Sequence, residues 1–177
     1  MSDCDVLGLS FLTFERGSGL ETAVFADANY ADKADVRRAV SGVAVTLGKS
    51  VVSRSSGTQG VASLSTAQAM YIATGDGVKE GFFVKSVSSF IVPSLSEKCV
   101  KVFADNDGVI ALTTNLLSSV RTKHIDVRFH FIIQLARSKT ICAEYVPTKE
   151  QREDILIKAL VGADFKAHRN FLMNLHV

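Results

Sequence analysis

Residues 21–27 have the sequence ETAVFAD, a short run of strand-forming residues that ends in an aspartate. The same pattern returns in residues 100–105, VKVFAD. A third run, TICAEYV in residues 140–146, is ended by Pro147, which lacks a backbone N–H group. Because helical patterns separate these runs, the sequence predicts an α/β domain with a mixed sheet and helices packed on it.

The segments around these strands predict a hairpin and several helices. Residues 40–47 and 50–54 are rich in strand-forming residues and flank Gly48-Lys49, the pattern of a β-hairpin. Residues 65–91 carry apolar and small side chains at three- and four-residue steps, and Ser65 with Gln68 forms a capping-box signature. Further helices are expected over residues 109–117, 148–160 and 162–175.

Two segments allow alternative interpretations. Gly75, Gly77 and Gly81 lie within the predicted helix, where each glycine costs about 1 kcal/mol relative to alanine. They indicate either close packing of the helix against the sheet or a break into two shorter helices. Residues 123–139 fit both strand alternation and helical spacing, although the length of the segment favours a helix.

Composition limits the class of protein. The chain has 177 residues, of which 47% are hydrophobic and 21% charged, which is typical of one globular domain. The net charge of +2 indicates that any nucleic-acid binding comes from local basic patches. We expect an intracellular protein with no membrane partner, because neither a long apolar run nor a secretory signal is present. The sequence does not distinguish cytoplasm from nucleus.

The three cysteines are Cys4, Cys99 and Cys142. An odd number at wide spacing indicates neither a disulfide framework nor a metal-binding knuckle. We therefore expect three reduced thiols.

Three aspartates are candidates for a metal site. Asp27 and Asp105 end two predicted strands, and Asp154 lies early in the helix expected after residues 140–146. Carboxylates that converge at a sheet edge repel one another, and a hard divalent cation such as Mg²⁺ is the usual compensation. Two such ions could activate water for phosphodiester hydrolysis. Alternatively, the three aspartates are helix caps or solvated turn residues.

Several stretches of the sequence resemble the ribonuclease H domain of copia-type retrotransposon polyproteins. They occur in the order found in that family and cover most of residues 21–160. The stretches are FADANYAD (25–32), Ser41-Gly42, LSTAQAMYIA (64–73), FADNDGVIAL (103–112), RTKHIDVRFHFI (121–132) and EYVPTKEQREDILIKAL (144–160). The combination of TKHIDVRFHFI with DILIKAL is more specific than any single motif.

The resemblance implies a ribonuclease H-like fold, a five-stranded mixed sheet with helices on both faces. It also implies that residues 123–139 form a helix. We expect the ribonuclease H-like domain to span residues 21–160. Residues 1–20 would be an extension with one more strand in residues 7–14, and residues 161–177 a C-terminal helix packed on the same domain.

The family cleaves the RNA strand of RNA–DNA hybrids with two Mg²⁺ ions (or Mn²⁺) held by three aspartates and a glutamate. By resemblance, the catalytic and metal-binding aspartates are Asp27, Asp105 and Asp154. The glutamate is absent: Met70 is the predicted lost position, and Gln68 is less favoured because it belongs to the capping box. A thioether is a poor ligand for Mg²⁺, so we expect one of the two ions to bind weakly or not at all.

The expected ligand is an RNA–DNA hybrid or another nucleic acid, and the ancestral partner is a reverse transcriptase domain in the same polyprotein. Arg121, Lys123 and Arg128 lie between the last two acidic positions and could contact phosphates. Equally, they could form a solvated helix face. Two functions remain open: an impaired hybrid ribonuclease, or an inactive module of the same fold that binds nucleic acid or protein.

Overall fold

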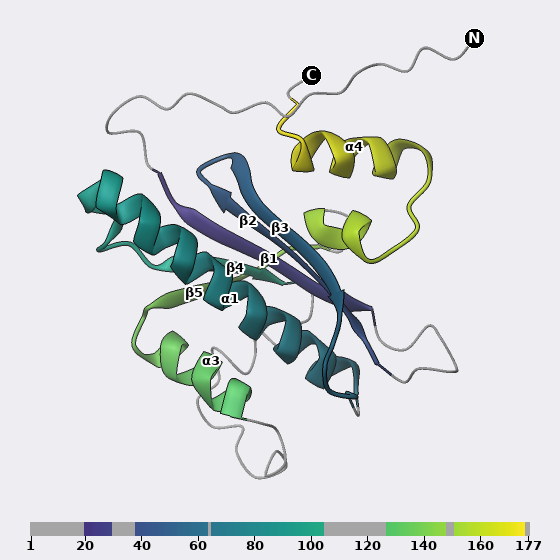
Figure 1. Ribbon diagram of the computed structural model, residues 1–177, viewed down its shortest axis with the longest axis horizontal. Helices are drawn as coiled ribbons and strands as arrows, with labels where there is room; N and C mark the ends of the chain where they lie inside the picture. The colour runs from purple at the N-terminus through teal and green to yellow at the C-terminus, as the bar shows by residue number, and fades with distance from the viewer. Residues whose placement is uncertain (1–19, 30–37, 64, 105–126, 148–150, 176–177) are drawn as a thin grey trace.

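A five-stranded mixed sheet forms the centre of the protein (Figure 1). The computed structural model describes residues 20–29, 38–63, 65–104, 127–147 and 151–175. The sheet has the order β3-β2-β1-β4-β5, with antiparallel pairing from β3 to β1 and parallel pairing from β1 to β5. Its strands are β1 (Thr22–Asn29), β2 (Val40–Leu47), β3 (Ser50–Thr58), β4 (Val100–Ala104) and β5 (Ile141–Tyr145). The mixed sheet is confirmed, and β3 extends beyond the predicted residue 54.

Helices cover both faces of this sheet, as expected. The helical elements are α1 (Thr66–Ile91), the 3-10 helix η1 (Pro93–Leu95), α3 (Val127–Arg137), the 3-10 helix η3 (Arg152–Leu156) and α4 (Gly162–Leu172). No helix in the described part of the chain has the length and apolar character needed to cross a membrane. The predicted helix over residues 109–117 and the predicted strand over residues 7–14 lie outside the described residues.

Helix α1 is continuous and lies close against the sheet. Its N-cap is Ser65, whose side chain accepts a hydrogen bond from the backbone N–H of Gln68 at 3.2 Å, as the capping signature predicts. A Cβ atom added at Gly77 or Gly81 would lie only 2.8 or 2.6 Å from the methyl groups of Val24. The glycines therefore permit close packing on β1, and the alternative of two shorter helices is wrong.

The main core lies between the sheet and helices α1 and α3. Every second residue of the central strands points to this face, which is the period expected for a strand. The buried members are Val24, Ala26, Val43, Val45, Val100, Val102, Ala104 and Ile141 of the strands, Met70, Tyr71 and Val78 of α1, and Ile132 of α3. Residues 127–137 are thus helical, as the resemblance implies.

A smaller apolar cluster covers the opposite face, where η3 and α4 lie. Phe25 of β1 stacks on Phe103 of β4 with ring centroids 4.8 Å apart, and Phe171 of α4 meets Phe25 edge-on at 5.5 Å. After α4, the Asn174 side chain accepts a hydrogen bond from the Val51 N–H at 2.7 Å and donates one to the Val51 carbonyl at 3.2 Å. These contacts fix the C-terminal segment against β3.

The predicted helix over residues 148–160 is wrong in type and extent. The described part of this segment forms only the short 3-10 helix η3, and the Gln151 side chain makes no capping hydrogen bond. The segment lies against β2 so closely that a Cβ atom at Gly42 would be 2.8 Å from Ile157 Cγ2 and 3.3 Å from the Glu153 carbonyl oxygen. Contact with the sheet overrides the helical pattern here.

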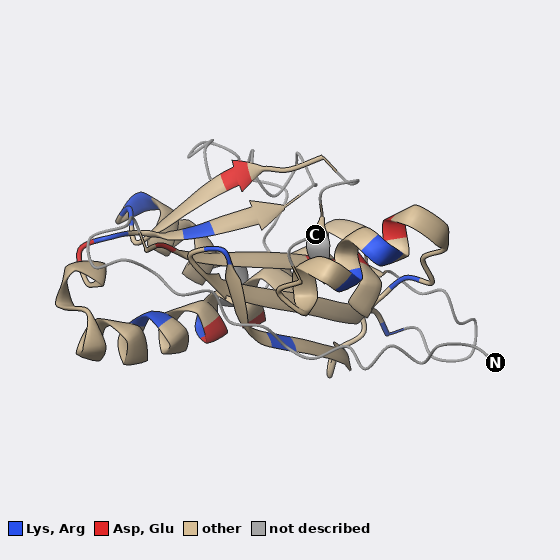
Figure 2. Ribbon diagram, turned by 90° about the horizontal axis from the view of Figure 1, so that it is seen from above, with Lys and Arg blue, Asp and Glu red and all other residues tan. Residues whose placement is uncertain are grey.

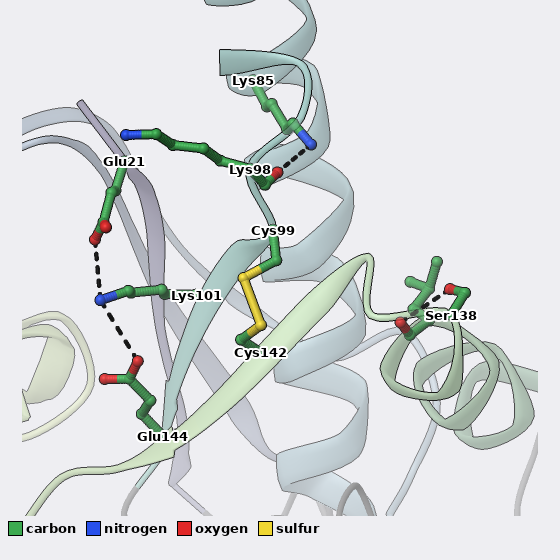
Figure 3. The surroundings of a disulfide bond; sticks show 9 residues. Glu21, Lys85, Lys98, Cys99, Lys101, Ser138, Cys142 and Glu144 are labelled. Atoms are coloured by element: carbon green, nitrogen blue, oxygen red, sulfur yellow. Dashed lines mark hydrogen bonds and ion pairs between the residues drawn. A yellow bond between two sulfur atoms is a disulfide. The ribbon is translucent and has the colours of Figure 1, made fainter. Parts of the chain in front are cut away.

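The expectation of three reduced thiols is also wrong, because Cys99 and Cys142 form a disulfide (Figure 3). Cys99 directly precedes β4, and Cys142 lies in the neighbouring parallel strand β5. Their Cα atoms are 6.1 Å apart, within the range that a disulfide spans. The two residues are separated by 43 positions, so only the strand order brings them together.

The close packing of α1 predicts the effect of Gly81→Ala. Alanine favours a helix over glycine by about 1 kcal/mol, but its methyl group would overlap Val24. We expect a net loss of about 1–3 kcal/mol in the free energy of unfolding, measured by urea denaturation. Gly57→Ala is the control, because no heavy atom lies within 4 Å of an added Cβ there. A Gly81→Ala variant as stable as the wild type would contradict this packing.

The disulfide predicts that reduction destabilises the fold. Opening the link between Cys99 and Cys142 should lower the free energy of unfolding by about 2–4 kcal/mol in urea titrations with and without reductant. A Cys4→Ser variant should show the same loss. In the unfolded, unreduced wild type, an alkylating reagent followed by mass spectrometry should modify Cys4 alone; modification of all three cysteines before reduction would refute the pairing.

Candidate active site

The candidate site begins with Asp27, near the end of β1. The residue is 4% exposed and pairs with Gly42 of β2 in the strand register. Its Oδ1 atom accepts a hydrogen bond from the Ala28 N–H at 2.7 Å. Asp27 points to the same face of the sheet as Phe25, because the two residues are two positions apart in one strand. That is the face on which η3 lies.

Helix η3 brings a second carboxylate, Asp154, to this place. Asp154 is 5% exposed, and η3 contacts both β1 and β2. The missing side chain at Gly42 leaves room for this approach, since an added Cβ would collide with Ile157. The strand end and the short 3-10 helix, far apart in sequence, therefore share one buried acidic site.

An ammonium group joins the two carboxylates. Lys158 Nζ lies 2.8 Å from Asp27 Oδ2 and 2.7 Å from Asp154 Oδ1. The Lys158 backbone N–H also donates a 2.7 Å hydrogen bond to the Asp154 carbonyl, which fixes the start of the side chain beside its partner. The Lys158 side chain is 34% exposed, against 6% and 7% for the two aspartates, so the lysine forms the solvent side of the site.

Met70 of α1 reaches the same strand end from the other face of the sheet. It is buried, and its sulfur accepts a hydrogen bond from the Ala28 N–H at 3.2 Å. Gln68 lies two residues nearer the start of α1, where its backbone N–H donates a hydrogen bond to the Ser65 side chain. Of the two predicted lost positions, Met70 is thus the one that contacts the residue after Asp27.

The remaining predicted site residues are not placed by the structure. Asp105, Arg121 and Lys123 lie outside the described residues. Arg128 is in the first turn of α3, where only the backbone is described. Among the described residues, lysine and arginine are interspersed with aspartate and glutamate over the elements (Figure 2).

Burial and ion pairing together set the electrostatics of the site. Burial raises the pKa of Asp154 to about 6; the neighbouring Asp27 adds to this effect, and Lys158 opposes it. Burial alone would lower the pKa of Lys158, but its contacts with Asp154 and Asp27 outweigh burial and hold the pKa above its usual value. The lysine therefore remains charged at neutral pH.

Sequence analysis did not single out Lys158. The available signal was its position four residues after Asp154, a spacing at which opposite charges meet on a helix. Its second contact, with Asp27, could not be inferred from spacing, because Asp27 lies in a distant strand.

The donor set of the described residues does not fit a two-metal site. It provides two carboxylates and a thioether, and Mg²⁺ prefers oxygen ligands. Lys158 Nζ already lies within hydrogen-bond distance of one oxygen of each carboxylate. In the part of the chain that the structure describes, no group of three or more His, Cys, Asp or Glu side chains is positioned to hold a metal ion.

Comparison with curated proteins gives retrotransposon polyproteins, while no protein-family model matches the chain. The chain is 30% identical over 142 residues to "Retrovirus-related Pol polyprotein from transposon TNT 1-94" of Nicotiana tabacum, a match that covers 80% of the chain. It is 28% identical over 152 residues, or 86% of the chain, to the corresponding polyproteins from transposons RE1 and RE2 of Arabidopsis thaliana. The chain spans 10% of the length of each of these relatives.

Comparison with solved structures gives ribonuclease H domains. The N-terminal RNase H domain of a Mycobacterium tuberculosis protein has a TM-score of 0.55 and 18% identity, covering 85% of this chain and 97% of that one. LC11-RNase H1, solved in complex with an RNA/DNA hybrid, has a TM-score of 0.55 and 15% identity, covering 77% of this chain and 94% of that one. These similarities show the ribonuclease H-like fold.

The raised pKa of Asp154 predicts a pH-dependent stability. Native Asp154 binds a proton more tightly than the unfolded chain does, so its contribution to the free energy of unfolding falls as pH rises from about 4 to about 6. The contribution of Lys158, whose pKa is also raised, is complete below about pH 10 and does not change in this window. We therefore compare the free energy of unfolding of the wild type with that of Asp154→Asn. The wild-type value minus the variant value should fall by about 1–3 kcal/mol between pH 4 and pH 6.

Urea denaturation at several pH values, in the presence of a chelator, measures this difference. A difference that rises from pH 4 to pH 6, or stays level, would contradict the raised pKa.

Proposed function

This chain belongs to the ribonuclease H-like domains of copia-type retrotransposon Pol polyproteins, and we propose that it descends from an enzyme that cleaved the RNA strand of RNA–DNA hybrids and is now catalytically impaired. One observation carries the proposal: the carboxylates of Asp27 and Asp154 converge while the position beside them holds the Met70 thioether. Two acids of the ancestral site have kept their residue type and their proximity. The nearby sulfur cannot replace the carboxylate of the missing glutamate.

The ancestral reaction would be hydrolysis of a phosphodiester supported by two divalent ions, Mg²⁺ or Mn²⁺. Asp27 and Asp154, with Asp105 as the third acid, are the proposed metal ligands. Arg121, Lys123 and Arg128 are the proposed phosphate contacts. In the proposed division of the chain, residues 21–160 form the hybrid-binding domain, with an extension before it and a C-terminal helix after it.

A second candidate function is hybrid binding without cleavage. The Lys158 ammonium favours it, because it neutralises part of the acidic site without a metal ion. Nucleic-acid binding needs basic contacts to phosphates and does not need the metal ligands. In this form the domain would be a binding module, and its ancestral partner a reverse transcriptase domain of the same polyprotein.

The direct test is cleavage of a labelled RNA–DNA hybrid with Mg²⁺ and with Mn²⁺, together with a binding measurement on the same hybrid. Slow cleavage that Asp27→Asn abolishes would support the impaired enzyme. Binding without cleavage would support the second candidate. If the chain neither cleaves nor binds the hybrid, both forms of the proposal fail.

Met70→Glu should restore part of the missing chemistry. The substitution returns an oxygen ligand beside Asp27, so we expect the cleavage rate of the hybrid to rise at least tenfold. Gln68→Glu is the matched control, because it adds the same charge nearer the cap of the same helix. A rise with Gln68→Glu instead would show that Met70 is not the lost position.

A further inference from the structure

Lys158 occupies the position between the two carboxylates at which a shared cation would be expected. Its Nζ atom donates a 2.7 Å charge-assisted hydrogen bond to Asp154 Oδ1 and forms an ion pair with Asp27 Oδ2 at 2.8 Å. Both aspartates are almost completely buried, so their negative charges are poorly screened by water. A positive charge at this place offsets part of the repulsion between them.

A divalent ion bridging the same oxygen atoms would compete with the ammonium. Mg²⁺ binds carboxylate oxygens at about 2.1 Å, so an ion shared by Asp27 and Asp154 would be held within a few ångströms of Nζ. Two positive charges that close together repel strongly in a partly buried site. The ion and the ammonium therefore cannot occupy the site together without movement of the lysine.

The geometry also allows the Lys158 side chain to move away from the two carboxylates. Its backbone is held by the hydrogen bond to the Asp154 carbonyl, but its side chain is 34% exposed and carries a flexible four-carbon stem. The two aspartates have no comparable freedom, because one is in a central strand and both are buried. Entry of an ion at this pair would thus move the lysine and leave the carboxylates in place.

We propose that Lys158 is the built-in counter-ion of the Asp27–Asp154 pair and competes with a divalent cation for the same two oxygen atoms. The inference rests on the proposed function only in taking this pair as the descendant of a metal site. Its effect on metal binding is separate from that of Met70: the missing ligand weakens metal binding, and the resident ammonium opposes it.

The competition between Lys158 and a divalent cation is tested by Mn²⁺ binding to the full 177-residue chain. The electron paramagnetic resonance signal of free Mn²⁺ measures the binding. We expect Lys158→Met to bind Mn²⁺ at least tenfold more tightly than the wild type, while Lys158→Arg, which keeps the charge, does not. Lys101→Met is the matched control: Lys101 also contacts two carboxylates, 2.9 Å from Glu21 and 3.5 Å from Glu144, away from this site. The Lys101→Met substitution should change the dissociation constant for Mn²⁺ less than twofold.

Adding Asp27→Asn to Lys158→Met should abolish the gain, which locates the ion at this pair. If Lys158→Met binds Mn²⁺ no more tightly than the wild type, or if the gain survives Asp27→Asn, the proposal is overturned. If the role of Lys158 were purely structural, its substitution would destabilise the fold but would not tighten metal binding.

A measurement on the wild type avoids any dependence on how the variants fold. Acetylation of lysines by a small anhydride, quantified by mass spectrometry, should modify Lys158 slowly without metal and faster at saturating Mn²⁺, while Lys101 keeps its rate. An unchanged or slower rate at Lys158 would also overturn the proposal. Neither measurement uses a hybrid, so failure here leaves the proposed function intact, and failure of hybrid cleavage and binding leaves the Mn²⁺ comparison valid.

Discussion

The close approach of α1 to β1 is the contact on which the rest of the structure depends. Gly77 and Gly81 face the methyl groups of Val24, and neither has a side chain to keep the helix away from the sheet. The helix therefore packs closer to β1 than it could with a larger residue at either position. This position buries the alternate residues of the central strands under one long helix. It also carries Met70 to the end of β1, where its sulfur meets the Ala28 N–H beside Asp27.

On the opposite face of the sheet, Gly42 allows a second close contact. Gly42 of β2 pairs with Asp27 of β1 in the strand register, and because it has no side chain, η3 can lie against β2 next to Asp27. Two buried carboxylates then come within reach of one cation, and Lys158 provides it from the same chain. Close packing at glycines thus assembles the site from both faces, and charge compensation within the chain stabilises it.

Much of the fold followed from local patterns. The strand runs between residues 21 and 146, the Gly48-Lys49 hairpin and the Ser65 cap are each specified by residues adjacent in sequence, and these are present in the structure. Residues 127–137 needed the family resemblance, because their periodicity suits a strand as well as a helix. The segment around Asp154 has the sequence pattern of a longer helix, but contact with β2 sets its conformation.

The sequence by itself determined the fold class, the residue types of the candidate site and the absence of a glutamate at positions 68 and 70. Each of these depends on composition, on short-range periodicity or on motifs that survive in order along the chain. Only the tertiary structure decided that Lys158 joins Asp27 to Asp154 and that Cys99 pairs with Cys142. Both facts join residues distant in sequence, and strand order and packing, rather than local preference, determine which distant residues meet.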